Sequence, residues 1–528
     1  MACVSYPQGC CFSSLADIAG KKIVVMGIGL HGGGEESVRF YIKHGASVIA
    51  TDTKTEEQLR PVISKLKNEF ESELKTGRLR FSLSTAPGAN DGHKIKEFEE
   101  ADVVIKNPGV KFTGSNNRFL MAAKAVETDM SVFLALCKIP VIAVTGSKGK
   151  STSAEAIYYG LEQAGYHPFL SGNIPGRSPY KYFDTDSGAN VADIVVLELS
   201  SWQLADLRGR GVLKPKAALI TPVYPDHMNW YENSMEDYAA DKKIIYKEQD
   251  ESGWTICELG GAHPRWGDEF AAETKARILR YSSTPLPNGI LGAWLEPFTE
   301  RSYPLGKIRL SPCNAEGDII VDELEVPGMA ARRNVLNAAL VLAALGVEAE
   351  KIRRIYAGWK GIKHRLEFFY RWQGAKAALR FYNDSAATIP EAAANALTAF
   401  DKPLWFICGG TDKEISAENL LPLLDALAAY KHKYKRPVFL IDGGAHNNFT
   451  RSKLLPALIQ NGIDYEGPFA NFDALLAALK MTIESTKFEA GTREEAVVFS
   501  PGAASFGLFD NEFVRGDIFK ETVSRIFG

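Results

Sequence analysis

"VIAVTGSKGKST", residues 141–152, joins four apolar residues to a short run of Thr, Gly, Ser and Lys. A buried strand that runs through a glycine loop into a helix points backbone N–H groups at an anion, and the helix dipole adds positive charge there. The common phosphate-binding loop reads G-x-x-x-x-G-K-[ST], whereas Gly146 is followed by Gly149 after only two intervening residues. We interpret the stretch as a shortened phosphate-binding loop; the alternative is a polar turn in which Ser or Thr caps the helix.

The residue types of this loop suit a nucleoside triphosphate. Lys150 is expected to reach the β- and γ-phosphates as a point charge, and the Ser151 hydroxyl is expected to bind Mg²⁺. The predicted ATP-binding loop comprises Gly146, Ser147, Lys148, Gly149, Lys150, Ser151 and Thr152.

Composition narrows the class of protein. The 528 residues carry a net charge of −3, from 61 basic and 64 acidic residues, and this balance argues against a nucleic-acid or membrane-surface partner. The seven cysteines are scattered and never form a C-x-x-C pair, which argues against a disulfide framework or a zinc site and favours a reducing compartment. The N-terminus lacks a secretory signal, and no apolar run reaches the ~18–20 residues of a membrane helix. We therefore expect a soluble cytoplasmic protein.

Strands and amphipathic helices alternate along the chain, which predicts an α/β fold with parallel sheets. The length, at ~100–200 residues per domain, favours three domains. We predict a Rossmann-like N-terminal domain at 1–128, a central P-loop ATPase-type domain at 129–362 and a Rossmann-like C-terminal domain at 363–528. Residues 56–74 are expected to form one charged surface helix, and residues 285–328 are expected to form antiparallel hairpins.

A second glycine pattern, G-x-G-x-x-G, lies near the N-terminus at Gly27, Gly29 and Gly32, and Asp52 follows twenty residues after Gly32. Read alone, this spacing is typical of a dinucleotide-binding βαβ unit. Two features argue against NAD: the chain has a separate phosphate-binding loop, and no residues suited to hydride transfer accompany the pattern. We therefore do not assign an NAD site to this domain.

Four further stretches follow the loop in a fixed order: VLELSSWQL at 196–204, YPDHMNWY at 224–231, KHRLEFF at 363–369 and FYNDSAAT at 381–388. With TGSKGKS, they resemble motifs of the Mur ligase family, whose corresponding segments read LELSSFQL, EDHMDRY, HRxE and NDSKAT. The resemblance covers nearly the whole chain. It implies a three-domain, ATP-dependent amide ligase of peptidoglycan synthesis, and specifically one that adds D-glutamate to UDP-N-acetylmuramoyl-L-alanine.

The resemblance also implies a catalytic centre with two Mg²⁺ ions. Glu198 and His227 correspond to magnesium ligands of the family, and Lys242, the fourth residue after Tyr238 on a predicted helix, corresponds to a lysine that is carbamylated there. The implied catalytic residues are Lys150, Glu198, His227 and Lys242. The implied metal ligands are Ser151, Glu198, His227 and carbamylated Lys242.

Further ATP contacts are implied outside the loop. Asn334 matches an adenine-binding asparagine, although Arg333 replaces the histidine that precedes it in the family. Arg365 matches an arginine that reaches the phosphates from the third domain. Asp384 is placed on the ribose or magnesium side, and Ala386 replaces the lysine of NDSKAT.

The same resemblance assigns the two substrate pockets. The implied UDP-substrate contacts are Gly29, Leu30, His31, Asp52, Thr53, Lys54, Asn107, Gly109, Asn173 and Gln203. The implied amino-acid contacts are Thr388, Lys413, Ser505 and Phe513. In a direct count Glu512, and not Phe513, occupies the place of the family's aromatic residue.

The implied reaction activates a carboxylate by phosphoryl transfer from ATP, after which the glutamate amine captures the acyl phosphate. Three alternatives stay open: L-glutamate as the amino acid, a folylpolyglutamate-type amide ligase, and a nucleotide-regulated binding protein built on a decayed ligase. The intact set of implied catalytic residues argues against decay. We expect a monomer with small-molecule substrates.

Overall fold

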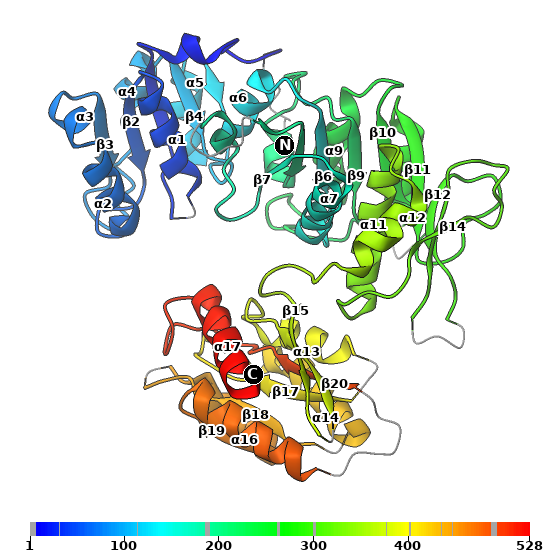
Figure 1. Cartoon of the computed structure of the whole chain (residues 1–528). Coiled ribbons are helices and arrows are strands. Elements are labelled where there is room, and N and C mark those ends of the chain that lie inside the picture. The colour runs from blue at the N-terminus through cyan, green and yellow to red at the C-terminus, as the bar shows by residue number, and fades with distance from the viewer. Residues whose placement is uncertain are drawn as a thin grey trace. The chain divides into compact units, whose positions relative to one another are not determined.

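The computed structural model describes residues 7–30, 32–112, 114–184, 191–260, 264–298, 303–375, 377–400, 403–434, 436–445, 447–486 and 494–528. These residues form three β-sheets with helices packed on their faces (Figure 1). The predicted α/β class is confirmed. The chain divides into two compact units: unit 1 (Met1–Pro297, Leu305–Ile320 and Leu336–Ile352) and unit 2 (Phe298–Pro304, Val321–Val335 and Arg353–Gly528).

The first sheet lies in unit 1, and its paired strands are parallel. The strand order is β3-β2-β1-β4-β5, with β1 (Lys22–Met26), β2 (Ser47–Asp52), β3 (Leu79–Leu83), β4 (Val103–Lys106) and β5 (Val126–Glu127). Its helices are α1 (Gly33–Lys43), α2 (Arg60–Glu69), α3 (Glu71–Lys75), α4 (Ile95–Glu100) and α5 (Asn117–Ala122). Alternate residues of β1 enter two apolar clusters, one with α1 and α2 and the other with α4 and α5, so both faces are covered.

The segment predicted as one helix over 56–74 forms two helices, so that prediction is wrong. α2 begins at Arg60, with Pro61 in its first turn, where the missing N–H of proline removes no helical hydrogen bond. Phe70 separates α2 from α3 with non-helical φ and ψ of −119° and 41°, and its side chain is buried. A buried aromatic residue thus interrupts a segment whose composition favours one continuous helix.

The second sheet also lies in unit 1 and has the order β14-β13-β12-β11-β10-β9-β6-β8-β7. Its strands are β6 (Val141–Thr145), β7 (Pro168–Gly172), β8 (Ile194–Glu198), β9 (Ala217–Ile220), β10 (Trp254–Glu258), β11 (Arg277–Ser282), β12 (Gly292–Leu295), β13 (Gly306–Arg309) and β14 (Asp318–Val321). The strands from β7 to β12 pair in parallel, whereas β12 and β13 are antiparallel. The predicted hairpin is therefore confirmed for β12 and β13.

Along the chain, α6 precedes the strands of this sheet, α7 to α10 lie between them, and α11 and α12 follow them. The bounds are α6 (Asp129–Leu136), α7 (Lys150–Ala164), α8 (Ser201–Ala205), α9 (Met235–Lys247), α10 (Pro264–Glu273), α11 (Met329–Ala344) and α12 (Ala349–Ala357). One apolar cluster joins α6, α8, α9 and α10 to strands β6, β8 and β9. The central strands are fully buried. This packing places the loops that follow β6, β8 and β9 at one edge of the sheet, because the three strands are parallel.

The third sheet lies in unit 2, with the order β15-β16-β20-β17-β18-β19. Its strands are β15 (Glu367–Gln373), β16 (Ala378–Asn383), β17 (Leu404–Cys408), β18 (Val438–Ile441), β19 (Tyr465–Phe469) and β20 (Glu494–Phe499), and β15 alone among the pairs described is antiparallel to its neighbour. Its helices are α13 (Pro390–Thr398), α14 (Ala417–Tyr434), α15 (Leu455–Gln460), α16 (Phe472–Ser485) and α17 (Glu512–Phe527). One apolar cluster contains α13, α14 and α15, and the other contains α16 and α17, which covers the two faces (Figure 1).

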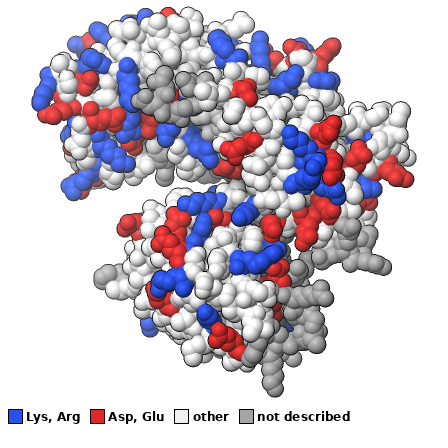
Figure 2. Space-filling model, viewed as in Figure 1, with Lys and Arg blue, Asp and Glu red and all other residues white. Residues whose placement is uncertain are grey.

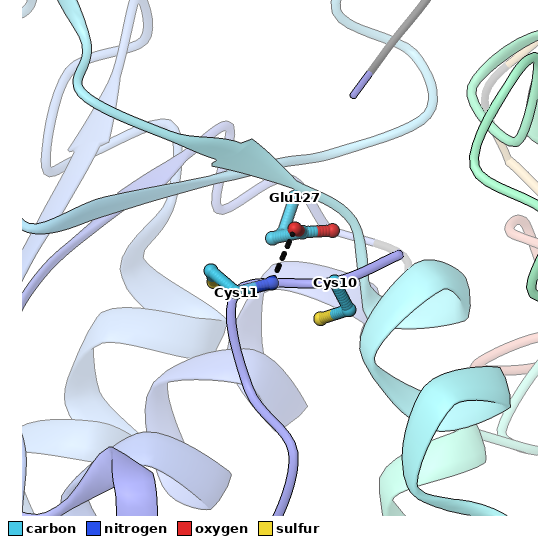
Figure 3. A group of neighbouring side chains, drawn as sticks. All are labelled: Cys10, Cys11 and Glu127. Atoms are coloured by element: carbon cyan, nitrogen blue, oxygen red, sulfur yellow. Dashed lines mark hydrogen bonds between the residues drawn. The ribbon is translucent and has the colours of Figure 1, made fainter. Parts of the chain in front are cut away.

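A short segment before β1 packs against unit 1 and brings Cys10, Cys11 and Glu127 together (Figure 3). The Cys11 backbone N–H donates to Glu127 Oε1 at 3.0 Å. Glu127 Oε2 accepts from Ser131 Oγ at 2.6 Å and from Arg210 Nη1 at 2.7 Å. Because the carboxylate is neutralised by an arginine and accepts three hydrogen bonds, we assign this cluster a structural role in fixing the N-terminal segment.

Charges of both signs are mixed over the face of the molecule shown in Figure 2, in keeping with the net charge of −3. Among the described residues, no helix is both long enough and apolar enough to cross a membrane.

Candidate active site

The loop after β6 has the geometry of a phosphate cradle. Gly146 has a φ of +139°, and a Cβ atom at this position would lie 1.9 Å from Thr221 Oγ1, so only glycine fits. Gly149 is the N-cap residue of α7 with a φ of +86°, and no side chain caps the helix. The first N–H groups of α7 are therefore left to a different acceptor, which is the arrangement that binds anions.

Ser147 ties this loop to the loop that follows β9. Its Oγ donates to the Tyr224 carbonyl at 2.8 Å, accepts from the Tyr224 N–H at 2.9 Å and lies 3.0 Å from the Tyr238 hydroxyl. The side chain is buried. The Ser147 side chain therefore stabilises the conformation of the loop. The side chain of Lys148 is exposed to solvent.

Two lysines lie on the loop from different elements. Lys150 Nζ donates to the Ser147 carbonyl at 3.0 Å, and Lys242 Nζ, from α9, donates to the Gly146 carbonyl at 2.8 Å. Burial lowers the pKa of Lys150, against the opposing charges of Glu198 and Asp226. Burial, followed by the neighbouring charge of Lys150, holds the pKa of Lys242 well below its usual range.

Glu198 ends β8 beside these lysines, and its side chain is only 1% exposed. Asn173 contacts it twice: the Asn173 backbone N–H donates to the Glu198 carbonyl at 2.8 Å, and Asn173 Nδ2 donates to Glu198 Oε1 at 3.3 Å. A Cβ atom on Gly172 would lie 2.0 Å from the Glu198 carbonyl oxygen, so the two strand ends approach closely. The structure thus brings a predicted metal ligand and a predicted UDP-substrate contact together.

His227 lies on the loop after β9 with a left-handed backbone, φ +54°. Its side chain is 49% exposed, and its Nε2 lies 3.9 Å from Asp226 Oδ2. The His227 ring packs 5.0 Å from the ring of Trp202 on α8. An exposed imidazole at the same sheet edge as Glu198 and Lys150 is suited to bind a ligand from solvent.

The predicted UDP-substrate residues cluster after β1, β2 and β4. Asp52 Oδ2 accepts from the Gly29 N–H at 2.9 Å, and Asp52 Oδ1 accepts from the Lys54 N–H at 3.0 Å, so this carboxylate shapes both loops. Asn107 Oδ1 accepts from the Gly109 N–H at 3.1 Å. The predicted contacts Leu30, Thr53 and Lys54 are exposed. His31 lies outside the described residues. Gln203 is buried on α8, where its Oε1 accepts from the Ser200 N–H in a capping box.

The remaining predicted ATP contacts lie in unit 2. Asp384 follows β16, and burial raises its pKa to about 7, against hydrogen bonds from Ser500 and Leu366 that favour the charged form. Ser500 Oγ donates to Asp384 Oδ2 at 2.6 Å, and the Leu366 N–H donates to Asp384 Oδ1 at 3.1 Å. Arg365 is exposed beside this contact, and Asn334 is half-buried on α11.

The predicted amino-acid residues lie on loops at the third sheet. Ser505 is buried, and its Oγ has no hydrogen-bond partner among the described residues, which leaves a hydroxyl for a ligand. Lys413 is exposed, and its Nζ lies 6.0 Å from the centre of the Phe506 ring. Thr388 is half-buried, and Phe513, the second residue of α17 after Glu512, has 48% of its surface exposed.

Three residues in these sites escaped the sequence reasoning. Asp226 precedes His227 in the same motif and acts on both buried lysines. Arg515 is 1% exposed and donates to Ser385 Oγ and to three carbonyl oxygens, including that of Ala504 at 2.8 Å. Asn337, on α11, is buried with its Oδ1 unpartnered among the described residues. Of the three, only Asp226 stands inside a motif quoted above, YPDHMNWY at 224–231.

The chain is similar to known proteins over nearly its whole length. Residues 144–345 match the family model of the Mur ligase middle domain. The UDP-N-acetylmuramoylalanine–D-glutamate ligase of Treponema pallidum (strain Nichols) is 35% identical over 97% of this chain and 98% of the relative. The enzyme of the same name from Borreliella afzelii (strain PKo) is 33% identical over 97% of this chain and 99% of the relative.

Solved structures support the fold at lower identity. The crystal structure of the UDP-N-acetylmuramate–alanine ligase from Thermotoga maritima superposes with a TM-score of 0.51 at 14% identity, covering 96% of this chain and 99% of that one. A structure of UDP-N-acetylmuramoyl-L-alanyl-D-glutamate–2,6-diaminopimelate ligase gives 0.50 at 16% identity, with 92% and 87% covered. From the full-length relatives and the matched middle domain, the chain belongs to the Mur ligase family, among its UDP-N-acetylmuramoylalanine–D-glutamate ligases.

Proposed function

We propose that the chain adds D-glutamate to UDP-N-acetylmuramoyl-L-alanine at the expense of ATP, in peptidoglycan precursor synthesis. Besides the family membership, one observation supports the proposal. The buried amine of Lys242 and the amine of Lys150 both donate to carbonyl groups of the glycine loop, and the negative charge of Asp226 acts on both amines. The Lys150 amine at the N-terminus of α7 suits a polyphosphate, and the buried amine of Lys242 beside it is available for carbamylation. A binding protein that had lost its chemistry would have no need of a buried lysine there.

The donor set around the loop fits magnesium. Ser151, Glu198, His227 and carbamylated Lys242 would hold two Mg²⁺ ions through oxygen and imidazole nitrogen atoms. Carbamylation needs a neutral amine, and burial supplies one by lowering the pKa of Lys242. When bound, the ions neutralise charge on the transferring phosphoryl group and on the leaving nucleotide.

The residues of the chain then act mainly by positioning and charge. The loop amides and Lys150 hold the triphosphate, so that the precursor carboxylate can attack the γ-phosphorus in line and form an acyl phosphate and ADP. The glutamate amine next attacks the acyl carbon, a tetrahedral intermediate forms, and phosphate leaves. His227 is a candidate base for the incoming ammonium group only where it is not held as a metal ligand.

Substrate assignments follow the same logic. The loops shaped by Asp52 and Asn107 are proposed to hold the UDP moiety, and the unpartnered hydroxyl of Ser505, with Lys413, is proposed to hold the glutamate carboxylates. Domain boundaries near residues 128 and 362 are supported by β5, which closes the first sheet, and by β15, which opens the third. We further propose a monomer that works in the cytoplasm, where ATP and nucleotide-linked precursors are made.

One assay tests the proposal. Purified full-length protein is given UDP-N-acetylmuramoyl-L-alanine, ATP and Mg²⁺, and phosphate release is followed with D-glutamate, L-glutamate or no amino acid. Release that depends on D-glutamate supports the proposal. Release with L-glutamate alone identifies the stereochemical variant, and release with a folate and glutamate but not with the muramoyl precursor identifies a folylpolyglutamate-type ligase.

A further inference from the structure

Two departures from the family motifs lie against each other in the structure. Trp202 stands where LELSSFQL has Phe, and Trp230 stands where EDHMDRY has Arg. Their ring centroids are 4.3 Å apart and their planes are 25° from parallel, so the two indoles stack. The stack is closed by His227, 5.0 Å from the Trp202 ring, and by Lys111, whose Nζ lies 3.8 Å from the Trp230 ring centre.

The stack joins three segments that are distant in the sequence. Lys111 follows β4 and the loop of Asn107, Trp202 lies on α8 after β8, and Trp230 follows β9. The Trp230 backbone N–H donates to the His227 carbonyl at 2.8 Å, so Trp230 and His227 belong to one turn. An arginine in place of Trp230 could not provide the same flat aromatic surface.

His227 needs such support. Its side chain is 49% exposed, which leaves an unsupported imidazole free to change orientation, and its left-handed backbone is an uncommon conformation that the surrounding turn has to hold. Residues that pack against a metal-ligating side chain fix its orientation and so raise metal affinity. Among the described residues of unit 1, the aromatic ring that contacts His227 is that of Trp202, and Trp230 packs against the other side of this contact by stacking on Trp202.

We propose that Trp202 and Trp230 are positioning residues that hold His227 in the orientation in which it binds the divalent ion, with Lys111 closing the stack by a cation–π contact. The metal role of His227 comes from the proposed function, and this inference rests on it. The stack itself rests on the geometry alone.

The test separates the stack from the chemistry by using full-length protein and three readouts. Circular dichroism reports the exciton coupling of the stacked indoles. Calorimetric titration with Mn²⁺ in the presence of ADP gives a dissociation constant for the ion. Initial rates give the Mg²⁺ concentration for half-maximal phosphate release and the KM for D-glutamate.

Trp230→Ala is expected to abolish the exciton signal, to raise the Mn²⁺ dissociation constant about 10-fold, and to raise the required Mg²⁺ concentration without changing the KM for D-glutamate. Trp230→Phe is expected to restore most of the ion affinity, because it keeps an aromatic face. The matched control is Trp254→Phe on β10. The Trp254 ring contacts Arg277, at 3.9 Å from the ring centre, and lies outside the stack, so this substitution should change none of the binding values.

Two outcomes would overturn the inference: loss of the exciton signal with an unchanged Mn²⁺ dissociation constant, and wild-type protein that binds no Mn²⁺. If Trp230→Ala does not fold, Trp202→Leu, which removes the ring that contacts His227 and keeps an apolar side chain, is measured in its place with the same expectation of weaker ion binding. Failure of the wild type to release phosphate contradicts the proposed function, while the Mn²⁺ and exciton readouts still decide whether the stack positions His227.

Discussion

The Nζ atom of Lys242 lies 2.8 Å from the carbonyl oxygen of Gly146, across 96 residues of sequence. The lysine is 1% exposed, and it also lies 4.2 Å from the centre of the Tyr238 ring. A buried amine therefore faces the first residue of the glycine loop, and the state of that amine sets the local charge where a triphosphate would bind. The predictions below follow from this contact and from two buried charges in unit 2.

Lys150→Ala is expected to lower the rate of ADP formation by about 10³-fold or more, because the substitution removes the cation that we propose to hold the transferring phosphoryl group. Binding of the UDP precursor, measured by calorimetry, should be unchanged, since Asp52 and Asn107 shape a separate pair of loops. The exposed residue Lys275 supplies the control Lys275→Ala. Loss of precursor binding as well would indicate a folding defect and contradict a role confined to the phosphates.

Lys242→Ala is expected to lose most activity and to regain part of it when a small carboxylate such as acetate is added, because acetate can replace the proposed carbamate. Lys243→Ala is the matched control: the neighbouring lysine pairs with Glu269 and Glu273 on the surface, and its loss should have little effect. Initial rates against acetate concentration provide the measurement. Absence of rescue at every concentration would argue that the amine itself, and not a carbamate, is required.

The same lysine predicts a dependence on carbon dioxide and pH. Because burial lowers the pKa of Lys242, its neutral amine persists to lower pH than that of a surface lysine and can react with dissolved CO₂. Activity in CO₂-depleted buffer should fall as pH decreases, since protonation of the amine blocks reformation of the carbamate, and bicarbonate should restore it. Activity that is indifferent to bicarbonate at every pH would contradict carbamylation.

Asp384→Asn is expected to stabilise unit 2 at pH 8. The folded pKa of about 7 lies above the usual value of 3.8 for an aspartate, so the folded state retains a proton that the unfolded state releases, and the free energy of unfolding falls as pH rises between these values. The resulting penalty is roughly 3–4 kcal/mol above pH 7. Hydrogen exchange of β16 amides at pH 5 and pH 8 measures it.

In the asparagine variant this fall between pH 5 and pH 8 should disappear, because an amide does not titrate in this range. The amide can still bond to Ser500 and Leu366, so the local structure is kept. The exposed carboxylate of Asp425 on α14 provides the control Asp425→Asn, which should follow the wild type. An Asp384→Asn variant whose stability still fell with pH would show that another group titrates.

Arg515→Lys is expected to raise the KM for D-glutamate at least about 10-fold and to destabilise unit 2 by about 2–4 kcal/mol, because a lysine cannot replace the fixed fork of a buried guanidinium. Arg515 joins Ser385 to Ala503 and Ala504, next to the predicted glutamate contact Ser505. The KM for ATP should stay within about twofold. Arg525→Lys, on the exposed side of α17, is the control, and an equal effect there would assign the loss to the helix as a whole.

Much of the fold was predictable because it depends on local patterns. The strand, glycine loop and helix from Val141 to Ala164 follow from a continuous apolar run and from glycines whose positive φ is a local property. The expected helix over 56–74 failed at Phe70, where burial against the core outweighed helical composition. Motif resemblance, and not periodicity, supplied the candidate ligands.

By itself, then, the sequence determined the order of strands and helices, the shortened loop and the family, since each depends on residues close together in the chain. Only the tertiary structure decided that Lys242 faces Gly146, that Arg515 joins the loop of Ser385 to the loop of Ala503 and Ala504, and that Trp202 stacks on Trp230. These contacts depend on how distant segments pack, and burial there sets the protonation of Lys242 and Asp384. Packing distances of this kind are not encoded in residue spacing, because they arise from the cooperative fit of the whole core.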